Sequence, residues 1–115
     1  MKNNVVKDKS FAFAVRVVAL YKFLKDEKKE YVLSKQVLRS GTAIGALVRE
    51  AEQAESKKDF VHKLAIALKE ANETEYWLEL LHKTEYLNAP EFSSIHNDVI
   101  ELVKLLTSII KSSKG

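Results

Sequence analysis

The sequence predicts an all-α protein, an antiparallel up-and-down four-helix bundle, and three observations lead to this prediction. Apolar residues recur at spacings of three and four along most of the chain, without the alternation typical of strands. One proline and three glycines leave few points where a helix must end. The 115 residues fit one domain, residues 1–115, which can bury about two thirds of its unfolded surface.

The first helix is predicted over residues 10–27. Its inward stripe consists of Phe13, Val17, Leu20 and Leu24. A second apolar set, Phe11, Val15 and Val18, projects from the opposite side. A helix that is apolar nearly all round buries more than one face, so we expect this helix to have a second partner.

The second helix is predicted over residues 34–55, with Ser34 as its N-cap, and the third over residues 58–83, after Ser56 or Asp59 as cap. Each carries one continuous apolar stripe. The stripes are Val37, Gly41, Ile44, Val48 and Ala51 in the second helix, and Phe60, Leu64, Ala67, Ala71, Thr74, Leu78 and Leu81 in the third.

The fourth helix is predicted over residues 91–112, with Pro90 suited to its first turn. Its stripe is Phe92, Ile95, Val99, Leu102, Leu106 and Ile109. Four helices of about 18 to 25 residues joined by short connectors predict a bundle about 30 Å long.

Gly41 and Gly45 lie inside the second helix, where each costs about 1 kcal/mol relative to alanine in an exposed setting. Gly41 falls on the inward stripe and Gly45 close to it. The pair predicts a helix-packing notch that the first or the third helix fills. In a chain this charged, the spacing is not a membrane signal.

A second apolar patch on the third helix consists of Ile66, Trp77 and Leu80, which project away from its inward stripe. We expect this patch to form an oligomer interface, because unpartnered apolar patches mark contact sites. The alternative is that Trp77 only covers the edge of the bundle.

The chain contains no cysteine, which excludes disulfides and thiolate zinc sites and is typical of a cytoplasmic protein. The apolar run over residues 11–24 is interrupted by Arg16 and Lys22, so we predict neither a signal peptide nor a membrane span.

Glu79 and His82 have the spacing found in di-iron bundles, but neither His62 nor His96 has a glutamate three residues before it. No phosphate-binding glycine loop or nucleophile elbow is present. We therefore predict no metal, no cofactor and no catalytic residue, in a protein that is not an enzyme.

Glu75 falls near the inward stripe of the third helix, where a carboxylate must be paired or neutral. Its candidate partners are Arg16, Arg39, Tyr21 and Tyr31. A structural hydrogen-bond network is the simpler interpretation, and a carboxylate general base is the alternative.

The net charge is +3, and its surplus lies in the first 30 residues. At the start of the third helix, Lys57, Lys58, His62 and Lys63 surround a helix N-terminus, which favours anions. These four residues are the candidate nucleic-acid or anion contacts. In a single subunit, an ordinary solvated helix start is the favoured interpretation of these residues.

Three runs within residues 33–81, "RSGTAIGALVREA", "SKKDF" and "IALKEANETEYWL", carry a family pattern. The chain resembles the small four-helix-bundle proteins encoded in intervening sequences of bacterial 23S ribosomal RNA genes. Ala43 and Leu47 depart from the pattern, since relatives usually have Ser and Asn there. The resemblance implies a ring-like homopentamer without known enzyme activity. That family looks related to retroelement accessory proteins thought to bind nucleic acid and a reverse transcriptase.

Two functions follow as hypotheses. The first is a non-enzymatic homo-oligomer that binds RNA, DNA or another polyanion, since a ring of five would carry about five times the charge of one chain. The second is a protein–protein adaptor or scaffold for a nucleic-acid enzyme such as a reverse transcriptase.

Overall fold

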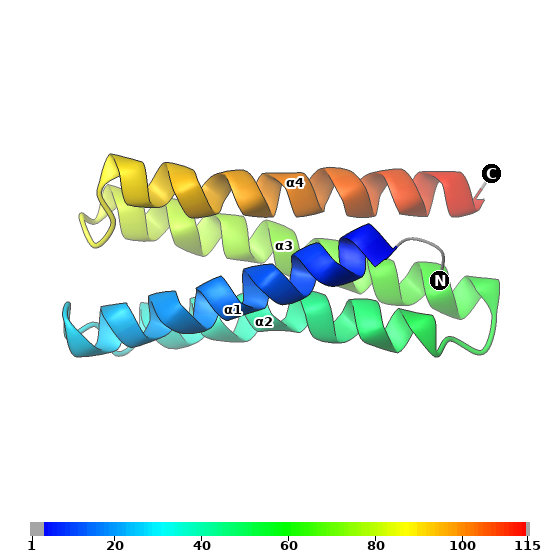
Figure 1. The fold of residues 1–115 in the computed structure, drawn as a ribbon, viewed down its shortest axis with the longest axis horizontal. Coiled ribbons are helices and arrows are strands. Elements are labelled where there is room, and N and C mark those ends of the chain that lie inside the picture. Colours follow the sequence, from blue (N-terminus) through cyan, green and yellow to red (C-terminus); the bar gives the residue numbers. More distant parts are fainter. Residues whose placement is uncertain (1–3, 115) are drawn as a thin grey trace.

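The structure, a computed structural model, describes residues 4–114 and consists of four helices with short connections. The helices are α1 (Asn4–Asp26), α2 (Leu33–Glu52), α3 (Lys57–Lys83) and α4 (Ala89–Lys114). The part of the chain that the structure describes contains no strand. The predicted all-α, four-helix fold is confirmed. Successive connections lie at alternate ends of the long axis (Figure 1).

The bundle measures 44 × 20 × 18 Å and is longer than the sequence predicted. The difference arises because α3 and α4 have 27 and 26 residues, and 27 residues of helix span about 40 Å. The first helix begins at Asn4, six residues before its predicted start. The second ends at Glu52 instead of residue 55.

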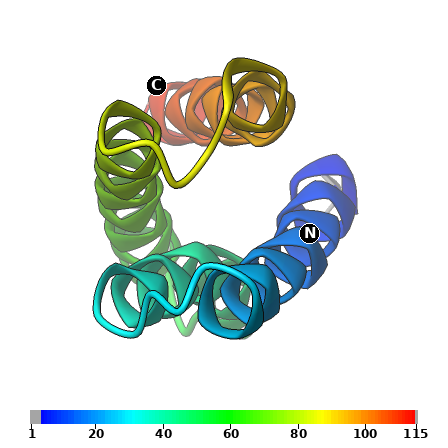
Figure 2. The ribbon, with the colours of Figure 1, turned by 90° about the vertical axis from the view of Figure 1, so that its left-hand side faces the viewer.

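Each helix packs beside the next, and α4 also meets α1, over a smaller contact (Figure 2). The predicted inward stripes of all four helices face the core. Only Phe60, Phe92 and Ile109, at the ends of their stripes, are partly exposed. The apolar periodicity therefore predicted the rotation of each helix about its own axis correctly.

The helix starts correct one prediction and confirm another. The hydroxyl of Ser56 accepts a hydrogen bond from the backbone N–H of Asp59 at 3.0 Å, so Ser56 is the cap of α3. Ser34, however, lies inside the first turn of α2 with its side chain buried. The carboxylate of Glu30 caps this helix instead. It accepts hydrogen bonds from the backbone N–H groups of Ser34, at 2.7 Å, and Val32, at 3.3 Å.

Gly41 and Gly45 lie where α1 passes over α2. A Cβ atom at Gly41 would lie 2.8 Å from both γ-carbons of Val17, and one at Gly45 would lie 3.2 Å from the backbone oxygen of Ser10. Real Cβ atoms do not approach other atoms as closely as 2.8 Å. The helix that fills the notch is therefore α1, one of the two neighbours the sequence allowed.

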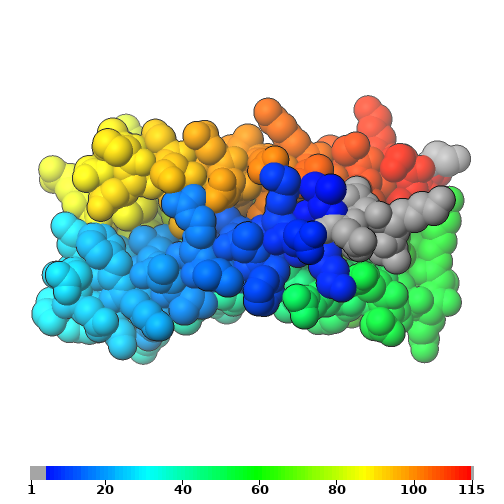
Figure 3. Space-filling model, viewed as in Figure 1, coloured from blue at the N-terminus to red at the C-terminus, as the bar shows by residue number. Residues whose placement is uncertain are grey.

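The outer face of α1 is apolar, and no other part of residues 4–114 covers it. Side chains of α1 (blue) lie across the middle of the face that Figure 3 shows, below those of α4. Among them, Phe11 and Val15 are 54% and 56% exposed, and Val18 is 36% exposed. The second partner that the sequence predicts for this helix is therefore not supplied by residues 4–114. No helix in residues 4–114 is both long and apolar enough to cross a membrane.

Candidate functional site

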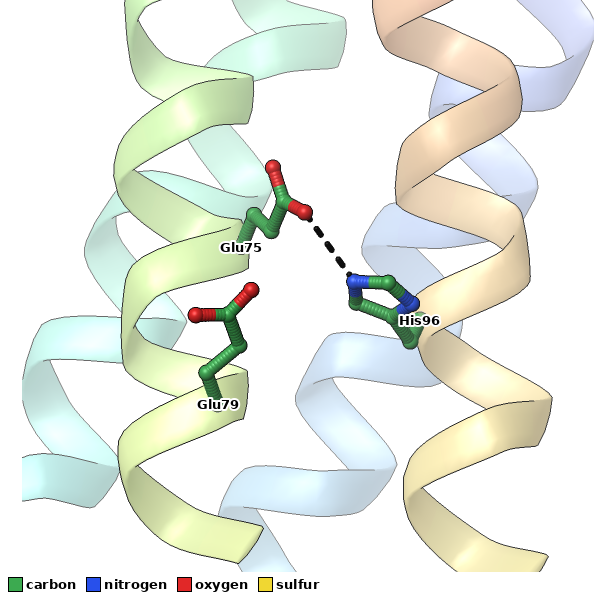
Figure 4. Close-up of side chains that lie close together, drawn as sticks. All are labelled: Glu75, Glu79 and His96. Carbon is green, nitrogen blue, oxygen red and sulfur yellow. Dashed lines mark hydrogen bonds and ion pairs between the residues drawn. The ribbon is translucent and has the colours of Figure 1, made fainter. Parts of the chain in front are cut away.

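A cluster of two carboxylates and one imidazole lies near the connection between α3 and α4. Glu75 and Glu79 stand one turn apart on α3, and His96 faces them from α4 (Figure 4). Oε2 of Glu75 lies 3.1 Å from Nε2 of His96. One side-chain donor atom from each of the three residues lies within 4.8 Å of the other two. Two neighbouring helices thus bring together three side chains of types that can ligate a metal.

The partners predicted for Glu75 are wrong. Its carboxylate is half-buried and pairs with His96, because Glu75 lies at the edge of the inward stripe and turns toward α4. The two candidate arginines form ion pairs with other carboxylates. Arg16 pairs with Asp98 of α4 at 2.6 Å, and Arg39 pairs with two glutamates of α3.

An aromatic stack holds the imidazole of the cluster. The ring of Phe92 lies between those of His82 and His96, with centroid distances of 4.6 and 4.7 Å and interplanar angles of 11° and 25°. Nδ1 of His82 lies 2.9 Å from the carbonyl oxygen of Leu87. Since a carbonyl oxygen only accepts, this nitrogen donates. His82 therefore anchors the stack, and the residue that faces Glu79 across the helices is His96.

A pocket of about 440 Å³ opens beside this cluster at the surface. Three apolar or aromatic side chains, Tyr76, Leu80 and Phe92, form much of its wall. The full lining is Tyr76, Glu79, Leu80, His82, Lys83, Phe92 and His96. Two of the three cluster residues thus lie on the wall of a pocket large enough for a small ligand.

The predicted interface residues Ile66, Trp77 and Leu80 are each partly exposed along one side of α3. Trp77 packs against the core, and its Nε1 donates a hydrogen bond to Oε2 of Glu73 at 3.0 Å. This hydrogen bond, together with the guanidinium of Arg39, lowers the pKa of Glu73 below its ordinary value. The hydrogen bond to Glu73 in turn raises the pKa of Arg39.

The predicted anion contacts divide between two places. Lys57 and Lys58 line a surface hollow at the start of α3, together with Lys114 at the end of α4. Lys63 instead pairs with Glu50 of α2 at 3.1 Å, and His62 is exposed. Sequence reasoning missed Lys114, because no local pattern indicates that the last turn of α4 returns to the first turn of α3.

Comparisons with known proteins agree with this fold. The family model described as 23S rRNA-intervening sequence protein matches residues 2–108. A crystal structure of a protein with unknown function from the S23 ribosomal protein family of Bacteroides thetaiotaomicron VPI-5482 is 68% identical, with a TM-score of 0.94. The match covers 96% of this chain and 99% of that chain. No curated protein matches. The family resemblance in the sequence is confirmed, and the chain belongs to the 23S rRNA-intervening sequence protein family.

Proposed function

We propose that this protein is a non-enzymatic module that binds RNA or another polyanion as a homo-oligomer. The observation that carries the proposal is the hollow lined by Lys57, Lys58 and Lys114. Several other cations are matched by carboxylates: Lys7 by Glu52, Lys9 by Glu101, Arg16 by Asp98, Arg39 by Glu70 and Glu73, and Lys63 by Glu50. Within residues 4–114, the three lysines of the hollow have no carboxylate at ion-pair distance, so their charge is available to an external anion.

The lysine side chains, rather than the start of α3, would supply most of the attraction. Ser56 already accepts the backbone N–H of Asp59, and the carboxylate of Asp59 lies in the first turn of the helix. This carboxylate offsets the partial positive charge of the helix start. Binding should therefore depend on the number of lysines and weaken steeply with salt, since each neutralised phosphate releases counterions.

Two separate apolar faces support the oligomeric part of the proposal. One is the outer face of α1, with Phe11, Val15 and Val18, and the other is the side of α3 with Ile66, Trp77 and Leu80. They lie on helices that do not pack against each other. A contact between two different faces is heterologous, and such contacts close into rings when the rotation allows it. A ring of five would multiply the lysine hollows as well as the net charge.

The nucleic-acid part is tested by measuring the affinity for a structured RNA at increasing salt. We expect binding at low salt that weakens as salt rises. Replacing Lys57 and Lys58 by Gln should lower the salt slope by roughly 1 to 2. The matched control is Lys63→Gln, because Lys63 pairs with Glu50 and should contribute much less. Absence of binding at low salt, or affinity independent of salt, contradicts the proposal.

The oligomeric part is tested by light scattering. Val15→Glu and Ile66→Glu each place a charge on one of the two apolar faces and should lower the mass of the assembly. Val32 is the control, since it is 69% exposed in the connection between α1 and α2 and lies outside both faces. Val32→Glu should leave the mass unchanged. If neither face variant changes the mass, the assignment of the interface is wrong.

The adaptor function is favoured by one feature, the pocket with Tyr76, Leu80 and Phe92 in its wall, where Tyr76 is 57% exposed. Aromatic side chains around an open pocket are typical of protein contact sites. A partner that stays bound after nuclease treatment supports the adaptor. A partner that is released by nuclease supports nucleic-acid binding instead.

A further inference from the structure

We propose that Glu75, Glu79 and His96 form a binding site for a divalent first-row transition-metal ion such as Zn²⁺. The sequence predicted no metal, because the Glu-x-x-His spacing relates only residues within one helix. The structure instead combines a glutamate pair on α3 with a histidine on α4.

The distances between the donor atoms are close to those that a zinc ion needs. Zinc bonds to nitrogen and carboxylate oxygen measure about 2.0–2.2 Å, which places tetrahedral donors about 3.4 Å apart. Oε2 of Glu75 and Nε2 of His96 are 3.1 Å apart, and all three donors lie within 4.8 Å of one another. Glu79 is exposed and free to close the remaining gap by a change of rotamer.

The histidine is held in a suitable orientation before any ion binds. Phe92 stacks on His96 and on His82, and His82 is fixed by its hydrogen bond to the carbonyl oxygen of Leu87. The stack restricts rotation of the His96 ring, whose Nε2 is directed at α3 (Figure 4). Residues that contact a metal-ligating side chain and fix its orientation are a regular part of metal sites.

The charge at this point also favours a cation. Glu75 and Glu79 are like charges at i,i+4, an arrangement that destabilises a helix by a few tenths of a kcal/mol. Elsewhere on α3, Glu70 and Glu73 share Arg39. Within the described range, no lysine or arginine lies at ion-pair distance from Glu75 or Glu79, and His96 is the one basic partner. A divalent ion would supply the missing positive charge.

The donor set selects among ions. An imidazole nitrogen suits Zn²⁺ and other first-row transition metals, whereas Mg²⁺ and Ca²⁺ prefer sites built from oxygen alone. Three protein ligands leave at least one coordination position for water or a small anion. Glu79 and His96 also line the neighbouring pocket, so that position would be reached from solvent.

The metal site is independent of the proposed polyanion site. Glu75 lies 18 residues beyond Lys57 on the same helix, which separates the two by about 27 Å. Loss of zinc binding therefore leaves the lysine hollow intact, and the two proposals fail separately.

The test is calorimetric titration of untagged, chelator-treated protein with ZnCl₂ near neutral pH. We expect one Zn²⁺ per chain and no measurable binding of MgCl₂. His96→Ala and Glu75→Gln should each weaken zinc binding at least about tenfold. Replacing a residue that only orients a metal ligand already weakens binding about 10- to 100-fold. His62→Ala removes an exposed histidine outside the site and should leave affinity unchanged. Lys83→Gln removes a positive charge beside the pocket and should leave affinity unchanged or increase it.

A second measurement on the unaltered chain covers the case in which His96→Ala does not fold. The imidazole NMR signals of His96 should shift when zinc is added, while those of His62 should not. The proposal is overturned if zinc does not bind, if His62 responds in place of His96, or if a folded His96→Ala variant binds zinc as tightly as the unaltered chain.

Discussion

The contact between α1 and α2 is close because two glycines carry no side chain there. The contact between α3 and α4, near the connection that joins them, is made by large side chains. At Gly41 and Gly45 the two helices approach until a single added carbon atom would collide or nearly do so. Between α3 and α4, the Phe92 ring and the Glu75–His96 pair fill a wider space beside an open pocket. The first contact leaves no room for change, and the second offers polar groups that can exchange partners.

This difference has an energetic cause. Close-packed interiors respond to the addition of even one methylene group, because neighbouring side chains already occupy their rotamer minima. Val17, which faces Gly41, is fully buried and β-branched, so it has little freedom to move aside. Glu79, at the other contact, is exposed and can move without disturbing the core.

The largest expected effect comes from Gly41→Leu. The new side chain would overlap Val17 and force α1 away from α2, so the free energy of unfolding should fall by about 3 kcal/mol or more. Urea denaturation followed by circular dichroism measures this change. Ala46→Leu on the exposed side of the same helix is the control and should stay within about 0.5 kcal/mol. Similar losses for both variants would mean that the close approach at Gly41 is not what limits the fold.

Alanine at the two glycines gives a smaller and more discriminating effect. Gly41→Ala places Cβ 2.8 Å from Val17 and should destabilise the protein by about 1–3 kcal/mol. Gly45→Ala places Cβ 3.2 Å from the backbone oxygen of Ser10, a milder overlap, and both variants gain the same helix propensity of about 1 kcal/mol. Gly45→Ala should therefore cost less. The order of the two urea midpoints is the measurement, and the reverse order contradicts the packing argument.

The same contrast explains what the sequence could and could not predict. Helices, stripes and the glycine notch were predictable because they depend on residues three or four apart. The Glu75–His96 pair joins residues 21 positions apart, and it depends on how α4 is rotated against α3. Lys114 lines the same hollow as Lys57 for a similar reason, because α4 returns to the start of α3.

The start of α4 carries a local sequence signal. Asn88 and Glu91 form a reciprocal capping box at the start of α4, in which each side chain accepts the other's backbone N–H at 2.9 Å. Its spacing of three residues is visible in the sequence. The helix therefore begins at Ala89, two residues before its predicted start.

The smallest expected effect is at the surface contact between α2 and α3, where Arg39 and Trp77 bind the carboxylate of Glu73. These hydrogen bonds lower the pKa of Glu73 in the folded state below its unfolded value. A carboxyl with a depressed folded pKa stabilises the fold above its unfolded pKa, and this stabilisation is lost as pH falls through the folded pKa. Because the pair is solvent-exposed, Glu73→Gln should cost less than about 1 kcal/mol near neutral pH.

The decisive measurement is the difference in unfolding free energy between the unaltered chain and Glu73→Gln as a function of pH. The difference should be constant near neutral pH and shrink in the acid range, once pH falls below the ordinary glutamate pKa of 4.5. A difference that persists after Glu73 is protonated would show that glutamine disturbs packing around Trp77. In that case the α2–α3 surface contact behaves like the α1–α2 contact, where shape rather than charge decides stability.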